Sequence, residues 1–414
     1  MGMKFGFLSS VMILATLGLT SCGTSTVASS GNGLLYVTTQ ANASVSVFGI
    51  NLSDGDLSTN GNATATGTQA SAMLLTPTGN AIFVANINPS SPPAAPNPGT
   101  ISSYTVNSDG TLAAGSTITE TNAIFPMGMA TDPAGKFLFV ANQGSFDLTQ
   151  PNTVAGSISV FSINGAALTE IPGSPFLTQT PAETASMVGT GPVSVAVTSN
   201  ASYLYVANQF TNDVGAFSIA SDGALTMLGP ASYNVGLSPS AVALTADGNF
   251  LFVANSGSNS LSAFAACTSA NLTCPVPDGS LTSIKGSPFA AGLTPVAMAM
   301  AIDSQGEYLF VADNASAQVS QYKVGLSSGV LTPNSPPAIS TGLGPVSIVV
   351  RTGPGTVLVD GGTTNYVYVA NAGGGTISTY SYDTIQGALT LVGSAVTTMG
   401  PVSYTHLPPQ MENP

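Results

Sequence analysis

Residues 250–255 have the sequence Phe-Leu-Phe-Val-Ala-Asn, and a segment of this kind occurs seven times along the chain. Each copy is short, rich in aromatic and β-branched residues, and apolar on both faces. Such a segment is typical of a strand that is buried between two neighbouring sheets. The seven copies are LLYVTT (34–39), AIFVAN (81–86), FLFVAN (137–142), YLYVAN (203–208), FLFVAN (250–255), YLFVAD (308–313) and YVYVAN (366–371).

Three further features recur with these copies. An alternating segment follows each one and holds a central aromatic residue, namely Phe48, Tyr104, Phe161, Phe217, Phe264, Tyr322 and Tyr380. A turn comes next, and its glycine accepts a positive φ without strain, at positions 55, 110, 165, 223, 279, 329 and 387. Another apolar strand precedes six of the seven copies, at 72–76, 127–131, 193–198, 241–245, 296–301 and 346–350.

The spacing of the turn glycines, 50 to 58 residues, leaves room for four short strands in each repeat. Seven such repeats without a helical pattern predict an all-β fold, a seven-bladed β-propeller of four-stranded antiparallel blades over residues 33–401. The strand that precedes each copy is expected to be innermost in its blade. The one that is missing belongs directly after Pro401, so we expect the closing strand to be truncated at the C-terminus.

The N-terminus has the features of an export signal. Lys4 precedes an apolar run at 5–18, and Leu-Thr-Ser-Cys at 19–22 matches a bacterial lipobox. We therefore expect residues 1–22 to be a lipoprotein signal peptide, Cys22 to carry the lipid, and residues 23–32 to be a flexible tether. An uncleaved anchor is disfavoured, because the apolar run is shorter than the ~18–20 residues that span a bilayer. The expected location is the bacterial cell envelope, periplasmic or cell-surface, with membrane contact only through the lipid.

The C-terminal residues differ from the repeats. VSYTHL (402–407) matches the translation of a transposon end that is used to prepare sequencing libraries, and PPQMENP (408–414) resembles nothing else in the chain. We expect residues 402–414 to be an artefact of that kind. His406, the one histidine of the chain, would then be absent from the natural protein.

Composition excludes several classes of protein. Only 6% of the residues are charged, and the formal net charge is −13 with five Lys and Arg. So few cations cannot neutralise a phosphate backbone, which excludes nucleic acid as a partner. A hydrophobic content of 43% argues against disorder.

The YVAN-like segments, the Ser-Asp-Gly turn at 108–110 and the Gly-Ser-Pro-Phe segments at 173–176 and 286–289 resemble the lactonase-type β-propellers. That family includes 6-phosphogluconolactonase-like enzymes and YVTN-repeat surface proteins, and the resemblance covers residues 33–401. It implies hydrolysis of a lactone by His, Arg and Glu side chains at the mouth of the central channel. Arg351, at the end of a predicted inner strand, is the cation that we expect nearest the channel.

Two sets of residues are candidates for a binding or catalytic site at the face that follows the YVAN strands. The first set, Asn86, Asn142, Asn208, Asn255, Asp313 and Asn371, would either form a polar collar for a ligand or cap the strand ends, and the sevenfold recurrence favours capping. Insertions at 87–99, 143–156 and 173–191 lie at the same face, where loops on a rigid scaffold often carry function. The catalytic candidates are Asp147, Glu183 and Arg351.

Cys267 and Cys274 belong to an insertion in the fifth repeat and are expected to form a disulfide in an exported protein, although a metal or redox role is an alternative. The sequence contains no metal-binding or nucleophile motif, so no metal and no cofactor are expected. The leading hypothesis is a tethered, monomeric propeller that binds a small molecule, glycan or envelope protein through its loop-rich rim, without proven catalysis. The alternatives are a lactone hydrolase with a carboxylate-based site and a structural envelope component.

Overall fold

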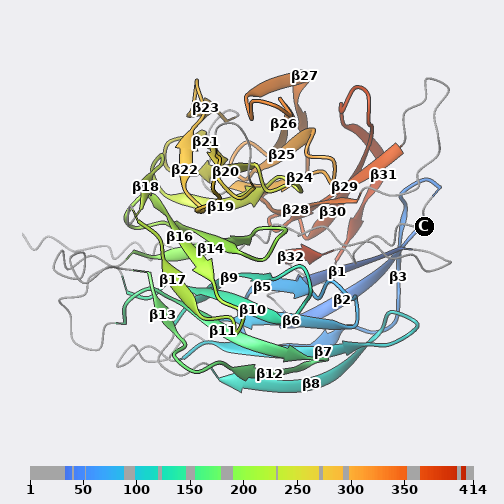
Figure 1. Cartoon of the computed structure of the whole chain (residues 1–414). Coiled ribbons are helices and arrows are strands. Elements are labelled where there is room, and N and C mark those ends of the chain that lie inside the picture. The colour runs from blue at the N-terminus through green and yellow to red at the C-terminus, as the bar shows by residue number, and fades with distance from the viewer. Residues whose placement is uncertain are drawn as a thin grey trace, which may run out of the picture.

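The computed structural model describes residues 33–39, 42–51, 53–87, 98–119, 124–145, 154–178, 190–229, 232–269, 274–291, 298–351, 364–398 and 402–406. These residues form strands β1–β32 and no helix, and the strands make seven antiparallel sheets. Within the described ranges, no helix is long and apolar enough to cross a membrane. Figure 1 shows the sheets arranged around a common centre, as the repeats predict.

Each sheet is one blade, and its strands are given from the innermost to the outermost; where five are given, the last two both pair with the third strand and together form the outer strand. Blade 1 is β32 (Val402–His406), β1 (Gly33–Thr39), β2 (Ser44–Ile50), β3 (Leu57–Thr59) and β4 (Thr64–Ala65). Blade 2 is β5 (Ala70–Leu75), β6 (Ala81–Asn86), β7 (Thr100–Val106) and β8 (Leu112–Thr119). Blade 3 is β9 (Pro126–Thr131), β10 (Phe137–Asn142), β11 (Ser157–Asn164), β12 (Ala167–Glu170) and β13 (Phe176–Leu177).

The other four blades repeat this order. Blade 4 is β14 (Pro192–Val197), β15 (Tyr203–Asn208), β16 (Asp213–Ile219), β17 (Leu225–Met227) and β18 (Tyr233–Asn234). Blade 5 is β19 (Pro239–Leu244), β20 (Phe250–Asn255), β21 (Ser260–Ala266), β22 (Leu281–Ser283) and β23 (Phe289–Ala290). Blade 6 is β24 (Met298–Ile302), β25 (Tyr308–Asp313), β26 (Gln318–Val324) and β27 (Leu331–Ser340). Blade 7 is β28 (Pro345–Arg351), β29 (Thr364–Asn371), β30 (Thr376–Asp383) and β31 (Thr390–Thr397).

The inner strands close a ring. Each one lies beside the inner strand of the next blade, in the order β5, β9, β14, β19, β24, β28 and β32, and β32 lies again beside β5. The strand that closes blade 1 corrects one expectation. We predicted that it is missing after Pro401, whereas Val402–His406 pairs with β1 at the predicted place, with Tyr36 opposite His406 and Val37 opposite Thr405. Strand pairing of this kind uses backbone groups, so it can form whatever the origin of residues 402–414. That these residues are an artefact stays a prediction.

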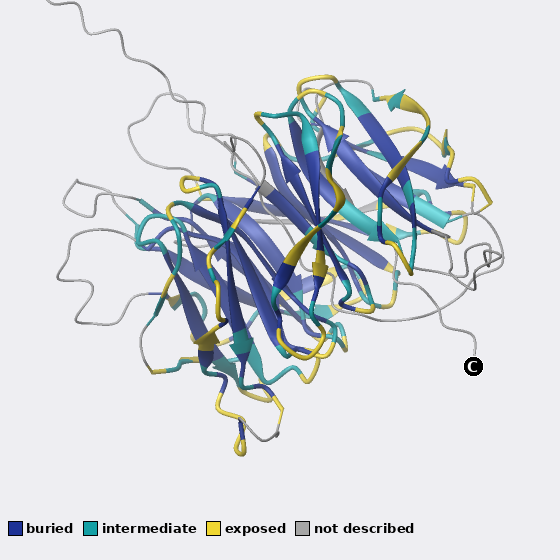
Figure 2. Ribbon diagram, turned by 90° about the horizontal axis from the view of Figure 1, so that it is seen from above, coloured by how far each residue is buried: buried dark blue, intermediate teal, exposed yellow. Residues whose placement is uncertain are grey.

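The antiparallel order gives the propeller two different ends. The turn face carries the connections from inner to second strand and from third to outer strand. The loop face carries the connections from second to third strand and from outer strand to the next inner strand. Figure 2 shows buried strands running between exposed connections.

The turn glycines connect one blade to the next. All seven have a positive φ, as predicted, from +61° at Gly165 to +89° at Gly223. A β-carbon on Gly279 would lie 2.5 Å from the ring of Tyr203, the first residue of the second strand in the preceding blade. In five other blades the glycine contacts a large side chain at or near the start of the second strand of the preceding blade, namely Leu34, Phe137, Phe250, Tyr308 or Tyr366. Of the seven turn glycines, only Gly165 has open space around it; the second strand of its preceding blade begins with Ala81.

The aromatic rows fill the spaces between blades. The predicted third-strand aromatics, from Phe48 to Tyr380, are at most 5% exposed. Tyrosine hydroxyls also donate hydrogen bonds between blades, from Tyr36 to the carbonyl of Gly110 (3.0 Å) and from Tyr205 to that of Gly279 (3.0 Å). The blades are therefore joined by packing and by specific polar contacts.

Candidate functional site

The row of asparagines closes the second strands at the loop face, and its side chains point into the blades. Every member is at most 1% exposed. Their amide nitrogens donate to hydroxyls of the third strand, as from Asn142 to Ser159 (2.8 Å) and from Asn255 to Ser262 (3.0 Å), and Asn208 donates to the Asp213 carboxylate (2.7 Å). This placement supports the capping interpretation, because buried side chains cannot form a collar that contacts a ligand.

The side-chain oxygens of these capping residues accept a hydrogen bond in some blades and lack one in others. Thr66 donates to Oδ1 of Asn86 (3.3 Å), and Thr341 donates to Oδ1 of Asn371 (3.1 Å). In both cases the threonine comes from the connection that leaves the preceding blade. The equivalent residues before blades 5 and 6 are Val235 and Ala291, which have no hydroxyl. Within the described residues, the buried oxygens without a hydrogen-bond partner include Oδ1 of Asn142, Asn208, Asn255 and Asp313.

Asp313 is the carboxylate member of this row. Ser320 donates to its Oδ2 at 2.6 Å, and Oδ1 lacks a partner. Burial raises the pKa of the Asp313 carboxyl to about 6, although the bond from Ser320 acts to lower it. Desolvation disfavours the charged form of a carboxyl, so Asp313 becomes protonated at mildly acidic pH.

Arg351 lies at the opposite end of the molecule from the asparagine row. It is the last residue of β28 and pairs with Tyr366, whereas Pro345, at the other end of the same strand, pairs with Asn371. Five residues of β29 separate the two positions, which is roughly 17 Å along a strand. Burial lowers the pKa of the Arg351 guanidinium, and Tyr368 and Tyr366 lie close enough to affect it. The structure therefore does not bring Arg351 to the loop face.

The other catalytic candidates, Asp147 and Glu183, lie outside the described residues, as does most of the three insertions. The described lysines are also away from the loop face. Lys136 precedes β10, and Lys323 pairs with Tyr308 near the start of β25, so both are at the turn face. Lys285 is exposed on the outer edge of blade 5, between β22 and β23.

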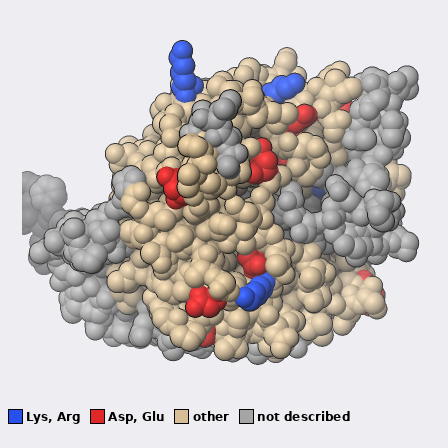
Figure 3. Space-filling view, in the orientation of Figure 1, with Lys and Arg blue, Asp and Glu red and all other residues tan. Residues whose placement is uncertain are grey.

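Most of the described carboxylates, like Lys136, Lys323 and Arg351, lie at the turn face. Thirteen are described, and ten of them belong to the turn face: Asp54, Asp56, Asp109, Asp132, Asp222, Asp247, Asp278, Asp303, Glu307 and Asp383. They cap turns, as when the Asp109 carboxylate accepts hydrogen bonds from the backbone and hydroxyl of Thr111, which lowers the pKa of Asp109. At the loop face the described carboxylates are Asp213 and Asp313, which are 7% and 1% exposed. Figure 3 shows how sparse charged side chains are on the surface in view.

The described part of the loop face carries amide and hydroxyl groups instead, together with the exposed Leu177, Leu237 and Leu343. Gln143 and Gln209, which directly follow the asparagines of blades 3 and 4, are joined by a hydrogen bond from Nε2 to Oε1 (2.8 Å). In blade 6 the equivalent Asn314 donates to the carbonyl of Pro345 in blade 7 (3.0 Å). These residues were not among the candidates predicted from the sequence, although their position directly after each YVAN segment could have identified them.

The backbone is strained at the same place. The residue before the inner strand has a positive φ in every blade whose connection is described, and it is not glycine at Gln69 (+53°), Phe125 (+56°) and Ser238 (+49°). Its carbonyl accepts a hydrogen bond from the residue after the asparagine, as from Gln209 to Gly191 (2.7 Å). Non-glycine residues in this region cost of order 1–3 kcal/mol each and persist where the surroundings hold them, often at ligand sites.

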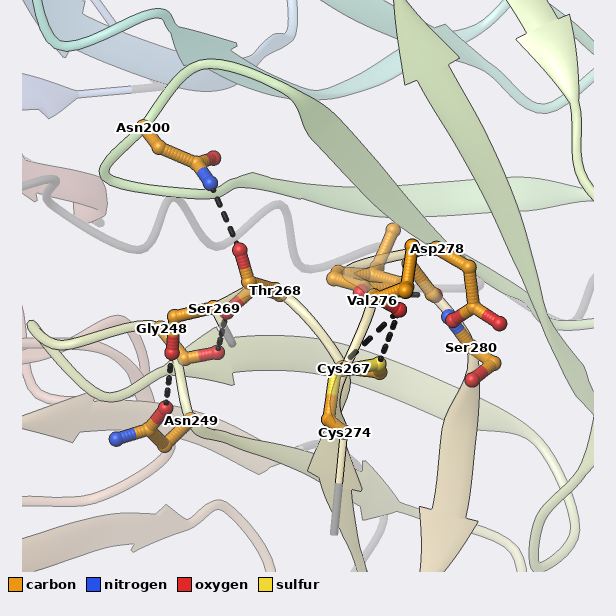
Figure 4. The surroundings of a disulfide bond; sticks show 12 residues. Asn200, Gly248, Asn249, Cys267, Thr268, Ser269, Cys274, Val276, Asp278 and Ser280 are labelled. Atoms are coloured by element: carbon orange, nitrogen blue, oxygen red, sulfur yellow. Dashed lines mark hydrogen bonds between the residues drawn. A yellow bond between two sulfur atoms is a disulfide. The ribbon is translucent and has the colours of Figure 1, made fainter. Parts of the chain in front are cut away.

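No group of three or more His, Cys, Asp or Glu side chains in the described ranges is placed to hold a metal ion. The structure joins Cys267 and Cys274 in a disulfide, in the insertion between β21 and β22 (Figure 4). The neighbouring Thr268 accepts a hydrogen bond from the side chain of Asn200 in blade 4 (2.9 Å), so this insertion is attached to the adjacent blade.

Seven four-stranded blades closed by a strand from the other end of the chain define the class of seven-bladed β-propellers. A family model described as "Lactonase, 7-bladed beta-propeller" matches residues 25–152 and 155–350. The chain therefore belongs to this lactonase family. A search of curated proteins gives no significant match.

Solved structures of the same fold include a proposed 6-phosphogluconolactonase from Bacteroides fragilis, with a TM-score of 0.68 and 20% identity over 92% of this chain and 99% of that one. Another is a proposed 6-phosphogluconolactonase from Bacteroides uniformis, with a TM-score of 0.69 and 16% identity over 91% and 100%. A third is the periplasmic gluconolactonase PpgL of Pseudomonas aeruginosa, with a TM-score of 0.67 and 20% identity over 91% and 98%. Identities this low show the fold alone.

Proposed function

We propose that the chain is an exported propeller, tethered to the membrane through a lipid on Cys22, that binds a small uncharged polar ligand at its loop face. The observation that carries the proposal is the distribution of charge. In the described residues, this face carries amides, hydroxyls and a few exposed leucines, while the four cations and every exposed carboxylate lie elsewhere. Phosphorylated ligands are usually held by Arg or Lys, so this face disfavours them. Sugars and sugar lactones fit donors and acceptors of this kind.

The test compares a neutral ligand with its charged counterpart. Glucono-1,5-lactone and 6-phosphogluconate are titrated against the mature protein by calorimetry, and we expect measurable binding of the first and none of the second. Gln209→Leu should weaken binding about tenfold, because Gln209 is part of the amide pair at the loop face. Gln305→Leu, an exposed glutamine at the turn face, is the matched control. Stronger binding of the phosphorylated compound would contradict the proposal.

A second candidate is hydrolysis of an unphosphorylated sugar lactone. Membership of the lactonase family favours it, and one protein of the same fold is called a periplasmic gluconolactonase. Asp147, Glu183 and Arg351 remain the candidate residues. Lactone opening above the spontaneous rate, followed in a pH-stat, would support this activity if Glu183→Gln or Asp147→Asn abolishes it while ligand binding persists. A rate equal to the spontaneous one would leave binding as the function.

A further inference from the structure

The chain enters the propeller at the turn face. Gly33, the first residue of β1, pairs with Ile50, the last residue of β2, and the turn at 51–56 follows directly. Ten residues, 23–32, separate Gly33 from Cys22. A flexible tether of that length has a root-mean-square reach of roughly 17 Å, which is less than the roughly 23 Å length of a seven-residue strand. A lipid on Cys22 therefore holds the turn face closer to the bilayer than the loop face.

Three consecutive blades carry exposed aliphatic side chains on the turns of this face. Val276, Leu326 and Ile385 are 73%, 55% and 50% exposed, and they lie in the connections between third and outer strands of blades 5, 6 and 7. We call them the apolar tips. In blades 2 and 4 the same turns carry the exposed Asp109 and Asp222 and no large exposed apolar residue.

The apolar tips lie on the three blades that precede blade 1 around the ring, and blade 1 is the blade from which the tether leaves. The hydroxyl of Tyr308 in blade 6 donates to the carbonyl of Ile385 in blade 7 (2.9 Å), and the hydroxyl of Tyr368 in blade 7 donates to that of Gly55 in blade 1 (3.5 Å). Figure 1 shows blades 6 and 7, in orange and red, continuing into the blue strands of blade 1. The bond from Tyr308 attaches the backbone of the Ile385 turn to blade 6, and the bond from Tyr368 attaches blade 7 to the turn of blade 1.

The charged groups around the tips limit the kind of surface that fits them. The cations at this end of blades 6 and 7 are Lys323 and the partly buried Arg351, and the carboxylates of blades 1 and 5–7 are Asp54, Asp56, Asp278, Asp303, Glu307 and Asp383. Carboxylates in excess disfavour an anionic surface, so the apolar contact must be made with zwitterionic lipid and should depend little on salt.

We propose that Leu326 and Ile385, together with Val276, form the contact between the tethered propeller and the lipid surface, so that the loop face points away from the membrane toward its ligand. The proposal rests on the lipid tether of the proposed function. Aliphatic side chains at an interface bind lipid weakly on their own. A tether makes the contact intramolecular, so a weak contact is enough to set the orientation.

Because the sequence contains no Trp, a single introduced Trp can report contact with the lipid through its fluorescence. The mature chain is coupled through Cys22, the cysteine outside the disulfide, to a maleimide lipid in phosphatidylcholine vesicles that contain brominated lipid. We expect the fluorescence of Leu326→Trp to be quenched at least threefold more than that of Leu343→Trp, an exposed leucine (68%) at the loop face. Equal quenching, stronger quenching of Leu343→Trp, or no quenching above that of uncoupled protein would overturn the proposal.

A second variant tests the native side chains. Quenching of Ile385→Trp should fall when Leu326→Ser is added and should not change when Leu237→Ser is added at the loop face. If the serine variant instead abolishes a dimer of the uncoupled chain in sedimentation, the tips are a contact between copies and the proposal is wrong. Mass spectrometry of the membrane fraction tests the natural lipid on Cys22 separately. Absence of the lipid would refute the tether of the proposed function. The orientation is tested independently by the quenching of the chemically coupled chain.

Discussion

The glycine of each third-to-outer turn is the residue on which contact between blades depends most directly. The positive φ at all seven positions follows from the turn type, so the sequence alone predicts it. The residue of the preceding blade that each glycine contacts cannot be predicted from the sequence, because it depends on how the two blades face each other. Six of these positions contact a large side chain, and only Gly165 has free space.

This difference predicts unequal effects of the same substitution. A methyl group at Gly387 would clash with the ring of Tyr308, whereas one at Gly165 meets no atom within 4 Å. In both variants the positive φ of an alanine lowers the free energy of unfolding by about 1 kcal/mol. Overpacking lowers it by about 1–3 kcal/mol more at Gly387 alone. Urea unfolding should therefore show Gly387→Ala to be the less stable variant. Similar midpoints for the two would contradict the packing argument.

Asp313 predicts a pH dependence of stability. Its folded pKa of about 6 exceeds the unfolded value of 3.8, so the folded state holds the proton more tightly. The stabilisation is complete below pH 4 and is lost as the pH rises through 6, by at most about 3 kcal/mol. Asp313→Asn should remove this loss, because an amide can donate to Ser320 as Asn255 does to Ser262.

Melting curves from pH 4 to 8 provide the measurement. The wild-type chain should lose stability over this range more steeply than Asp313→Asn does. The stability of both proteins should still decrease with rising pH because of Asp303, since burial also raises the pKa of that carboxyl to about 6. Parallel curves would show that Asp313 titrates normally.

Thr341 provides a test of the asparagine caps. Thr341→Val removes the donor to Oδ1 of Asn371 and leaves that oxygen buried without a partner, which costs about 1–2 kcal/mol. Thr332→Val, on the exposed face of β27, is the matched control and should be nearly neutral. Equal stability of the two variants in chemical denaturation would show that the cap does not need its second hydrogen bond.

At the scale of the element, the sequence predicts the inner three strands of each blade well and the outer strand poorly. The second strands are apolar on both faces because two blades cover them, and that pattern is visible in the sequence. The outer strand contacts the blade on one side, and in blades 1, 3, 4 and 5 it is split in two, as into β12 and β13. Short segments such as Phe176–Leu177 have no pattern long enough to be recognised.

The candidate site was predicted less well than the strands. The asparagine row was placed correctly at the strand ends, but its burial depends on contacts with the third strand. Arg351 was expected to be the cation nearest the channel, which stays a prediction; its end of the molecule, the turn face, follows from the strand direction. Gln143 and Gln209 come from two different blades, so their pairing could not be inferred from one repeat.

β32 supports a prediction about the whole ring. Removal of residues 402–414 would expose the inner edge of β1 and break the pairing of Val402–His406, which we expect to cost about 4 kcal/mol. Removal of residues 407–414 alone leaves the paired strand and is the matched control. Thermal melts should show a large loss of stability for the first truncation only. Equal melting temperatures would mean that β32 does not hold the ring closed.

The whole molecule is polarised by its turns. The seven repeats place their exposed aspartates at the turn face, and the described part of the loop face carries amides, hydroxyls and a few exposed leucines. The sequence contains all of these residues, but the division appears only when strand direction is known. The proposed ligand site and the proposed lipid contact lie on opposite sides of this division.

The pairing of β1 with β32 also has a consequence for export. Blade 1 is completed by a strand that follows all the other blades in the sequence, so the ring cannot close until that strand has been synthesised. An export channel that accepts extended polypeptide from the N-terminus would therefore receive a chain that has not yet completed its fold. For a chain that is exported as proposed, the delay that closure imposes on folding would favour passage across the membrane before the propeller forms.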